Sequence, residues 1–310
     1  MDTELFKNRK KYLIERFFYV LKNEGLKVFI KKIYKTIFNS NKINLDKMKI
    51  DNNLSLDEIF LKFGTDKGSL DGKKTYDQLK KTIEGRKKFK NYLEWIQREN
   101  PKSFKYQLGN NFTPYYEKYF SHLKNKKIKI LEIGVANGHS IASWFFYFPN
   151  AEIHAADIKK DYYFFYQSKR IKFHTLNCMN ENEVKKFIYK NKNFDIIIDD
   201  SLHIHETFFK NIKNFYPILN PGGIYILEDF RTPDRELELE AKYNEEMGGT
   251  LMGRPTTMRR VFECIKNKEI MENDILKEDI LNHIFSTIDK VEVSYLKHPG
   301  ASLGALFKKY

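Results

Sequence analysis

The segment Ile128–Ser140 constrains the fold more than any other part of the chain. Ile128–Ile133 is a mostly apolar run bounded by lysines and a glycine, which predicts a buried strand. A loop with glycines at positions 134 and 138 follows, and a helical pattern then extends from Ser140 to Phe148. Glycine permits a tight turn after a strand and leaves room where a helix N-terminus meets a ligand. The segment therefore predicts a ligand-binding loop in an α/β protein.

Strand and helix patterns alternate after residue 127. Four more strands are predicted, at Glu152–Ile158, Arg170–Leu176, Phe194–Ile198 and Gly223–Leu227, with helical patterns between most of them. Val291–Tyr295 and Leu303–Phe307 are expected to close the sheet as an antiparallel pair. Alternating strands and helices are typical of a doubly wound sheet. We therefore expect an α/β, Rossmann-like fold with a mostly parallel seven-stranded sheet and an antiparallel C-terminal strand.

Two helical regions are expected before this sheet. Residues 1–50 hold 13 Lys/Arg and 5 Asp/Glu, so 13 − 5 = 8 of the 14 net positive charges lie there. Leu13–Phe38 repeats apolar residues at helical spacing, and such a basic amphipathic arm packs on protein or lies on an anionic membrane surface. Residues 51–126 are expected to form a helical cap with an inserted hairpin over 71–106, and 127–310 the domain that holds the sheet.

Two of the predicted strands end in acidic pairs, Asp199-Asp200 and Glu228-Asp229. Carboxyl ends of neighbouring parallel strands meet at one edge of a sheet, so these carboxylates should converge. Like charges raise each other's pKa, and a divalent cation that prefers oxygen ligands, such as Mg²⁺, would relieve the repulsion. The alternative is that one pair caps a helix or meets a lysine. His203 follows on the same loop and can take a proton near neutral pH, with His205 as its competitor.

The glycine spacing separates two classes of cofactor. A dinucleotide loop normally reads G-x-G-x-x-G, whereas here Ala136 stands between glycines that are four residues apart. The acidic Glu132 suits a ligand with a positive sulfonium. Asp157 ends the second predicted strand, where a carboxylate can accept hydrogen bonds from ribose hydroxyls. These features favour S-adenosylmethionine (SAM) over NAD.

The run from Leu131 to Gly138 resembles motif I of the class I SAM-dependent methyltransferases. In the same comparison, Asn177-Cys178 falls where these enzymes place an acid and its neighbour against adenine, with Asn177 in place of the usual aspartate. The resemblance implies that the cofactor is held by Glu132, Gly134, Gly138, Ser140, Asp157, Ile158, Asn177, Cys178 and Asp199.

The acidic strand ends resemble a narrower group. Asp199–His203, Pro221-Gly222-Gly223 and Glu228-Asp229 look like the D-D-G-S-H, P-G-G and E-D segments of the macrolide sugar O-methyltransferases of the mycinamicin type. That resemblance implies Mg²⁺ ligands at Asp200, Glu228 and Asp229 and catalytic roles for His203 and Asp200. Ser201-Leu202 replaces Gly-Ser in this chain.

Two upstream segments resemble parts of the same group that fold over SAM. They are residues 64–68 (G-T-D-K-G) and 113–117 (T-P-Y-Y-E), and they add Lys67 and Tyr116 to the implied cofactor contacts. The two segments are close in sequence in that group, whereas about forty residues separate them here.

These observations predict a SAM-dependent O-methyltransferase of a sugar hydroxyl in bacterial surface-polysaccharide or other glycan biosynthesis. A nucleotide-sugar or lipid-linked glycan would suit the basic chain, with candidate phosphate contacts at Arg231, Arg235, Arg254, Arg259 and Arg260. The alternatives are a phosphate-derived or catechol-like acceptor, an RNA-modifying or nucleic-acid-binding protein, and an NAD-dependent oxidoreductase. The basic residues cluster in the N-terminal arm and no base-stacking motif is found, which argues against nucleic acid.

Cysteine usage and hydropathy bear on location. Cys178 and Cys264 show neither metal-site nor disulfide-framework spacing, which fits a reducing compartment. The sequence has no apolar run of bilayer-spanning length and no signal-peptide pattern. We expect a cytoplasmic enzyme whose residues 13–38 contact the inner face of the membrane, its own fold or a second copy of the chain.

Overall fold

The computed structural model describes residues 43–51, 53–68, 109–136, 138–158, 166–203, 205–230, 258–271, 273–296 and 302–310. The predicted amphipathic arm at 13–38 and the predicted hairpin at 71–106 lie outside these residues, as do Arg231, Arg235 and Arg254.

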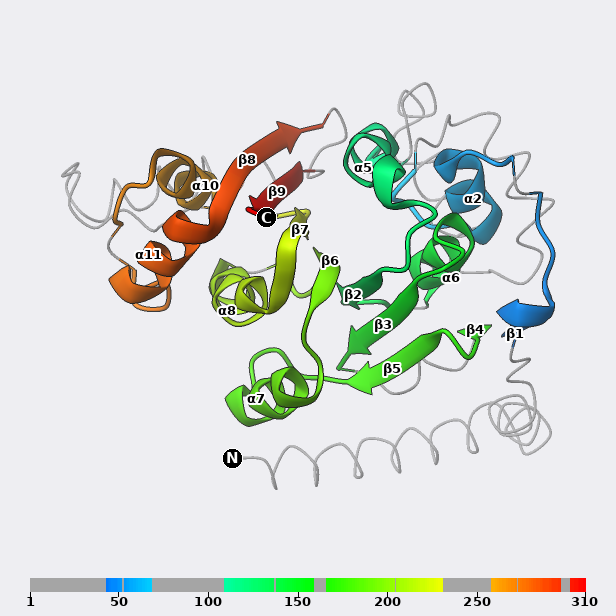
Figure 1. Cartoon of the computed structure of the whole chain (residues 1–310), viewed down its shortest axis with the longest axis horizontal. Helices are drawn as coiled ribbons and strands as arrows, with labels where there is room; N and C mark the ends of the chain where they lie inside the picture. Colours follow the sequence, from blue (N-terminus) through cyan, green and yellow to red (C-terminus); the bar gives the residue numbers. More distant parts are fainter. Residues whose placement is uncertain are drawn as a thin grey trace, which may run out of the picture.

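A seven-stranded sheet forms the centre of the molecule (Figure 1). In spatial order its strands are β5 (Ile171–Thr175), β3 (Glu152–Asp157), β2 (Lys129–Ile133), β6 (Phe194–Asp199), β7 (Leu219–Glu228), β9 (Ser302–Lys308) and β8 (Ile288–Tyr295). All neighbouring pairs from β5 to β7 are parallel, and β9 runs antiparallel to both β7 and β8. The predicted doubly wound sheet with an antiparallel C-terminal strand is confirmed.

Helices cover both faces of this sheet. One face carries α2 (Leu56–Phe63), α5 (Thr113–Phe120) and α6 (His139–Tyr147), and the other carries α7 (Glu181–Lys190), α8 (His205–Phe215), α10 (Met258–Asn267) and α11 (Glu278–Thr287). Successive side chains of β2 point to opposite faces of the sheet. Ile130 belongs to the hydrophobic core that includes Trp144 of α6, and Leu131 to the core that includes Phe208 of α8. Within the described residues, no helix has the length and apolar character needed to cross a membrane.

Local sequence signals explain where several elements begin and end. Ser55 caps α2 in a reciprocal capping box with Glu58, and Gly64 ends the helix in the left-handed conformation. Helix α8 ends at Phe215, earlier than the sequence pattern predicts, and a 3-10 turn over Tyr216–Ile218 follows, since proline at 217 restricts the residue before it. The predicted turn at 221–223 lies inside the long strand β7, where the pairing with β6 shifts register.

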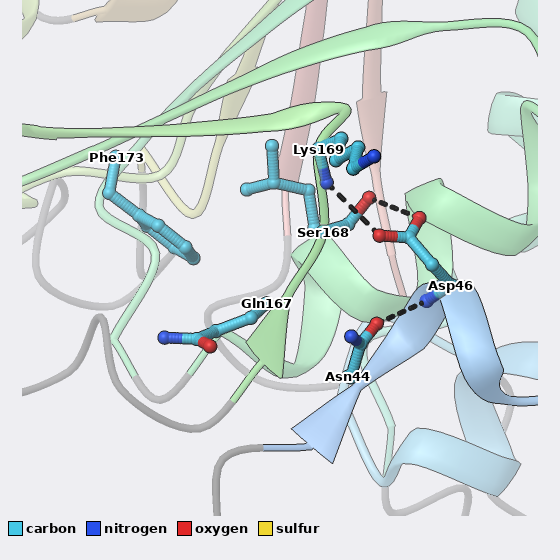
Figure 2. A pocket seen from close by; sticks show the side chains of 7 residues that line it. Asn44, Asp46, Gln167, Ser168, Lys169 and Phe173 are labelled. Carbon is cyan, nitrogen blue, oxygen red and sulfur yellow. Dashed lines mark hydrogen bonds between the residues drawn. The ribbon is translucent and has the colours of Figure 1, made fainter.

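A second, two-stranded sheet was not predicted. It pairs β1 (Ile43–Asn44) with β4 (Tyr166–Gln167), and each strand is too short for a hydrophobic period to reveal it. Asp46 holds the adjoining turn by accepting hydrogen bonds from the Ser168 hydroxyl at 2.8 Å and the Lys169 amide at 3.1 Å. Figure 2 shows these contacts at the rim of a cavity of about 380 Å³.

The order of the strands places a ligand site between β2 and β6. From β2 the chain moves outward to β3 and β5, and it then returns to β6 and β7 on the other side of β2. Ligands of open α/β sheets bind beyond the carboxyl ends of the strands at such a switch point. Ile133 and Asp199 are register partners at this point, so the loops that follow them share one crevice.

Candidate active site

The loop after β2 crosses the loop after β6 at very short range. Gly134 has a φ of +88°, and a Cβ atom there would lie 1.9 Å from the carbonyl oxygen of Asp200. The Asp200 amide also donates a hydrogen bond to the Ile133 carbonyl at 2.9 Å. Glycine at 134 is thus required by the backbone of Asp200 as well as by the turn. This crossing brings the predicted cofactor loop to the predicted catalytic aspartate.

Gly138 and Asp157 complete the cofactor loop. Gly138 precedes α6 with a φ of +76°, and a Cβ there would meet nothing nearer than the Tyr166 ring at 3.5 Å. Its conformation, more than crowding, requires glycine. Asp157 ends β3, and its Oδ2 accepts the Ala136 amide at 3.0 Å. The carboxylate predicted to bind ribose therefore lies against the loop predicted to bind the rest of the cofactor.

The residues predicted to contact the cofactor beyond the loop follow two neighbouring strands: Ile158 follows β3, and Asn177 and Cys178, the pair predicted to lie against adenine, follow β5. Ile158 is 59% exposed although it is apolar, and a similar residue that was not predicted, Met179, is 36% exposed. Asn177 accepts the Met179 amide at 3.0 Å and so shapes this turn. Burial raises the pKa of the Cys178 thiol. Exposed apolar side chains beside Asp157 can pack against a flat ring.

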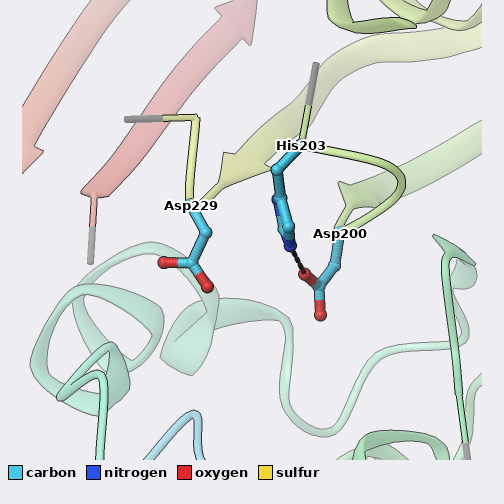
Figure 3. A group of neighbouring side chains, drawn as sticks. All are labelled: Asp200, His203 and Asp229. Atoms are coloured by element: carbon cyan, nitrogen blue, oxygen red, sulfur yellow. Dashed lines mark ion pairs between the residues drawn. The ribbon is translucent and has the colours of Figure 1, made fainter. Parts of the chain in front are cut away.

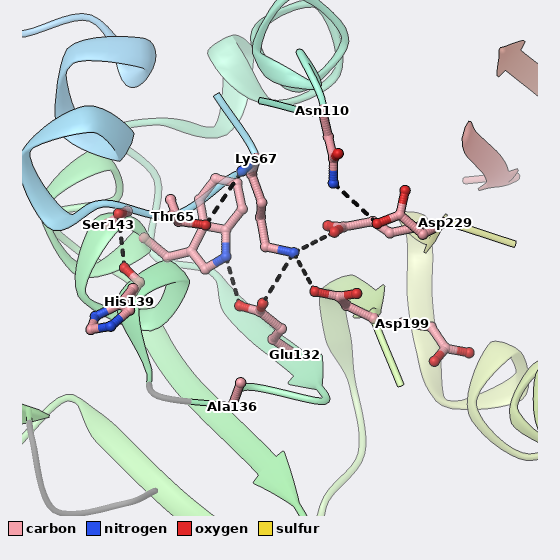
Figure 4. Close-up of polar contacts among 12 residues, drawn as sticks. Thr65, Lys67, Asn110, Glu132, Ala136, His139, Ser143, Asp199 and Asp229 are labelled. Carbon is pink, nitrogen blue, oxygen red and sulfur yellow. Dashed lines mark hydrogen bonds and ion pairs between the residues drawn. The ribbon is translucent and has the colours of Figure 1, made fainter. Parts of the chain in front are cut away.

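Lys67 lies among three carboxylates at the centre of the site (Figure 4). Its side chain is only 3% exposed, and its Nζ lies 2.7 Å from Oδ2 of Asp200 and 3.6 Å from Oε1 of Glu132. The ammonium also donates a hydrogen bond to Oε2 of Glu228. Burial alone would lower the pKa of Lys67, but Asp200 and Glu228 raise it well above its usual value. Lys67, a predicted cofactor contact, thus acts here as a buried counter-ion.

Glu132 lies beneath the cofactor loop and is fully buried. Burial raises the pKa of its carboxyl, whose Oε2 accepts a hydrogen bond from Nε1 of Trp144 at 2.8 Å. Trp144 lies on α6, so this hydrogen bond ties the strand β2 to the helix. Contact of Glu132 or Ser140 with a cofactor stays a prediction.

Glu228 differs from the predicted metal-ligand arrangement. Its side chain is buried, with one carboxylate oxygen facing Lys67 and the other accepting a hydrogen bond from the Tyr116 hydroxyl. Tyr116, predicted to contact the cofactor, is itself fully buried on α5. Both oxygens of Glu228 thus accept hydrogen bonds from protein donors, and Lys67 bridges Glu228 and Asp200.

Asp199 holds the loop that carries the candidate catalytic groups. It is fully buried, and its carboxylate accepts hydrogen bonds from the Tyr225 hydroxyl at 2.6 Å, the Asn211 amide at 3.0 Å and the Ser201 backbone amide at 3.3 Å. Its predicted contact with the cofactor stays a prediction, and in this structure the carboxylate fixes the start of the loop.

Asp200, His203 and Asp229 come together at the carboxyl ends of β6 and β7 (Figure 3). Each offers one ligand atom, and these atoms all lie within 4.8 Å of one another. Nε2 of His203 lies 3.7 Å from Oδ1 of Asp200, and the His203 side chain is 46% exposed. The cluster can therefore be reached by an acceptor molecule.

Asp229 has a carboxylate oxygen that is buried without a hydrogen-bond donor. Its Oδ2 accepts the Asn110 side-chain amide at 3.1 Å, whereas its buried Oδ1 has no hydrogen-bond donor. Burial, together with the charge of Asp200, raises the pKa of Asp229 to about 7. A buried carboxylate oxygen without a donor is uncommon, and a hard cation would satisfy it.

The two upstream segments with the long insertion between them lie side by side. The Asn110 amide donates to the Asp66 carbonyl at 2.7 Å, and the Phe112 amide donates to the Lys67 carbonyl at 2.9 Å. A Cβ on Gly109 would lie 1.9 Å from the Gly68 carbonyl oxygen, so the backbones of the two segments are in contact. Asn110 was not predicted as a site residue, although its place just before the Thr113-Pro114 helix start is a signal that could have drawn attention to it.

The remaining candidates lie at the periphery or outside the described residues. Arg260 lies exposed on α10, and its guanidinium is 3.3 Å from the carboxylate of Glu269. The side chains of Arg259 and His205 are not among those that the structure describes. Binding of phosphate by Arg260 stays a prediction.

The curated relatives found for the chain are O-methyltransferases, although no family model matches it. Mycinamicin VI 2″-O-methyltransferase of Micromonospora griseorubida is 30% identical over 168 residues, which are 51% of this chain and 40% of that protein. Demethylmacrocin O-methyltransferase of Streptomyces fradiae is 29% identical over 131 residues, 39% of this chain and 32% of that protein. The chain thus spans less than half the length of these curated relatives.

Solved structures of the mycinamycin-pathway methyltransferase MycE are also similar. The complex with Mg, SAH and mycinamycin VI shares 22% identity, with a TM-score of 0.46 over 64% of this chain and 48% of that one. A second crystal form with Mg and SAH shares 19% identity, with a TM-score of 0.46 over 76% of this chain and 61% of that one. By its sequence relatives and its sheet, the chain resembles the class I SAM-dependent sugar O-methyltransferases of the mycinamicin type.

Proposed function

We propose that the chain transfers the methyl group of SAM to a hydroxyl of a sugar. The observation that carries this proposal is the contact between Gly134 and Asp200, which joins the cofactor loop to a cluster of acidic and basic side chains. The relatives support the acceptor class, since their names describe O-methylation of mycinamicin VI, demethylmacrocin and a rhamnosyl tetracenomycin.

In this proposal the cofactor lies across the carboxyl ends of β2 and β3. Asp157 accepts hydrogen bonds from ribose hydroxyls, and Ile158 and Met179 pack against adenine. Gly134 and Gly138 provide the positive φ angles with which the loop runs from β2 to the start of α6, where the cofactor passes. When bound, SAM supplies a methyl group on a positively charged sulfur.

His203 is the proposed general base. Its exposed imidazole stands on the loop after β6, where it can accept the proton of an acceptor hydroxyl while the oxygen attacks the methyl carbon. The donor set next to it fits a divalent cation, because Asp229 has a buried oxygen without a donor and Asp200 lies within the same cluster. Asp200 and Asp229 would hold Mg²⁺, which when bound supplies positive charge that favours ionisation of the hydroxyl.

The wider setting of the reaction is part of the proposal. The net charge of +14 favours an anionic acceptor, such as a nucleotide-sugar or a lipid-linked glycan in cytoplasmic surface-polysaccharide synthesis. A neutral glycoside, like those in the names of the relatives, is the competing acceptor.

A methyl-transfer screen tests the proposal. The chain is incubated with labelled SAM and panels of nucleotide-sugars, neutral glycosides and catechols, with and without EDTA. We expect transfer to a sugar, lost in EDTA and lowered about 100-fold or more in His203→Gln. The exposed His283 on α11 is the matched control, and His283→Gln should retain full activity. Activity that survives both EDTA and His203→Gln contradicts the metal-and-base mechanism, and transfer to catechols alone contradicts the sugar acceptor.

A further inference from the structure

We propose that Lys67 and Asn110 are positioning residues that select which carboxylate oxygens face the metal, and that Glu228 is not a metal ligand in this chain. This inference rests on the metal-assisted methyl transfer proposed above. It assigns roles to two residues on either side of the long insertion, and it reduces the carboxylate ligands expected from the resemblance from three to two.

The two oxygens of Asp200 have different partners. Oδ2 lies 2.7 Å from the Lys67 ammonium, and Oδ1 lies on the side of His203, 3.7 Å from its Nε2. A charge-assisted hydrogen bond to a buried ammonium fixes the rotation of the carboxylate. Lys67 thus leaves Oδ1 as the oxygen of Asp200 that faces the cluster.

Asp229 shows the same division. Its Oδ2 accepts the Asn110 side-chain amide at 3.1 Å, and its Oδ1 is the buried oxygen without a donor. The Asp229 amide donates to the Ser302 carbonyl at 2.9 Å, so the backbone is fixed as well. Each aspartate therefore uses one oxygen to bind a positioning donor and keeps the other for a cation.

Among the described residues, Glu228 lies outside the cluster that could hold a cation, which consists of Asp200, His203 and Asp229. Lys67 and Tyr116 donate to its two oxygens, and its side chain is buried. A metal ion at the cluster would thus find Glu228 already held by two protein donors. Glu228 is one of three carboxylates around Lys67, together with Glu132 and Asp200.

The charges show why Lys67 and a divalent cation belong to the site together. Glu132, Glu228, Asp200 and Asp229 carry four formal negative charges against the one positive charge of Lys67, which leaves 4 − 1 = 3. A divalent cation would lower this excess to one. On formal charges, Lys67 alone does not offset the four carboxylates, so it does not replace a divalent cation.

Both positioning donors come from a single backbone unit. Asn110 is bonded through its amide to the Asp66 carbonyl, next to Lys67, and the Phe112 amide binds the Lys67 carbonyl. Hydrogen bonds between the backbones of the two segments thus fix the spacing of the two donors, which do not stand on independent loops. Gly68 and Gly109, which flank the insertion in the sequence, lie against each other in this unit.

Calorimetric titration of the full chain with Mn²⁺, without SAM, tests the ligand set. Asp229→Asn is expected to weaken Mn²⁺ binding about tenfold or more, whereas Glu228→Gln should change it by less than about threefold. The two variants are matched, because each turns one carboxylate of the same strand end into an amide. Equal losses in the two variants would overturn the proposal, since Glu228 would then be a ligand.

Two further variants test positioning. Asn110→Ala removes the donor to Asp229. The double variant Lys67→Met/Glu228→Gln frees Asp200 from its ammonium partner, and it keeps the formal charge of the site because one positive and one negative charge are lost together. Each should weaken Mn²⁺ binding about tenfold while the melting temperature of Asn110→Ala and its affinity for S-adenosylhomocysteine stay at wild-type values. Unchanged or tighter Mn²⁺ binding in Asn110→Ala overturns the positioning role, whether or not the double variant folds.

The same titrations separate this inference from the proposed function. A wild-type chain that binds no Mn²⁺ overturns the assignment of Asp200 and Asp229 as ligands but leaves metal-free methyl transfer intact. A chain that shows the expected pattern of Mn²⁺ affinities but transfers no methyl group from SAM overturns the proposed function alone.

Discussion

The ammonium nitrogen of Lys67 lies 2.7 Å from Oδ2 of Asp200, although 133 positions separate the two residues in the sequence. This contact joins the segment before the long insertion to the loop after β6. Lys67 is 3% exposed and Asp200 is 24% exposed, so the ion pair is partly shielded from solvent. The candidate site therefore depends on a residue that lies outside the continuous α/β pattern.

Removing this ammonium alone should destabilise the fold strongly. Lys67→Met leaves Glu132, Asp200 and Glu228 without their counter-ion, and loss of one partner of a buried ion pair costs about 3–5 kcal/mol. Urea unfolding of the variant and the wild type measures the difference. The control is Lys185→Met, whose exposed pair with Glu181 contributes little. Similar stability of Lys67→Met and the wild type would contradict a charged Lys67.

Gly134 and Gly138 should respond differently to alanine. Both have positive φ, but a Cβ at 134 would lie 1.9 Å from the Asp200 carbonyl oxygen, whereas one at 138 has 3.5 Å to the Tyr166 ring. Gly138→Ala is expected to cost only the backbone strain, about 1–2 kcal/mol. Gly134→Ala should cost more and also displace Asp200, so Mn²⁺ binding should fall in this variant alone. Equal unfolding free energies for the two variants would contradict the close crossing of the loops.

Two stacked histidines should make the sheet sensitive to acid. His154 and His174 lie on β3 and β5 with 3.0 Å between their facing ring nitrogens, and burial lowers the pKa of both, that of His174 to about 4. Both are therefore neutral in the fold, while histidines in the unfolded chain titrate with a pKa of about 6.5. The contribution of the neutral histidines to the free energy of unfolding is therefore complete above a pH of about 6.5. It is lost as the pH falls from there toward the lowered pKa of His174.

Unfolding in urea at neutral pH and at a pH between the unfolded and folded pKa values of His174 measures this loss. The free energy of unfolding should be lower at the more acidic pH, and His174→Gln, which keeps a donor but cannot titrate, should reduce the difference. A wild-type stability that is equal at the two pH values would show that the pair is not held neutral.

Asp157 should determine cofactor affinity without affecting the metal. Asp157→Asn weakens an acceptor of ribose hydroxyls, and we expect S-adenosylhomocysteine to bind about tenfold more weakly, since a hydrogen bond to a charged group contributes about 1.5–3 kcal/mol. Asp195→Asn is the control, because Asp195 lies near the opposite end of β6, bonded to the Lys129 amide. Equal affinities of the two variants would place the cofactor elsewhere.

Local patterns were sufficient to predict the sheet and its helices. Ile130 and Leu131 belong to a continuous apolar run because both faces of the sheet are covered, and the capping pair Ser55 and Glu58 marks the start of α2. The convergence of Asp200 and Asp229 also followed from strand order, since both stand at carboxyl ends of parallel strands.

The orientation of single side chains could not be predicted in this way. Glu228 precedes Asp229 directly, yet it turns to Lys67 and Tyr116, residues that precede the sheet in the sequence. Asn110 was missed for the same reason, because its contact with Asp229 spans 119 positions. Such contacts depend on how the upstream segments pack on the sheet, and no hydrophobic period encodes this packing.

The most direct test of the SAM site is a pair of calorimetric titrations of the wild-type chain. One uses S-adenosylhomocysteine and the other NAD⁺, because the loop from Gly134 to Gly138 distinguishes these two ligand classes by its glycine spacing. We predict saturable binding of S-adenosylhomocysteine at one site per chain and no binding of NAD⁺. Saturable binding of NAD⁺ with no binding of S-adenosylhomocysteine would contradict the proposed methyltransferase.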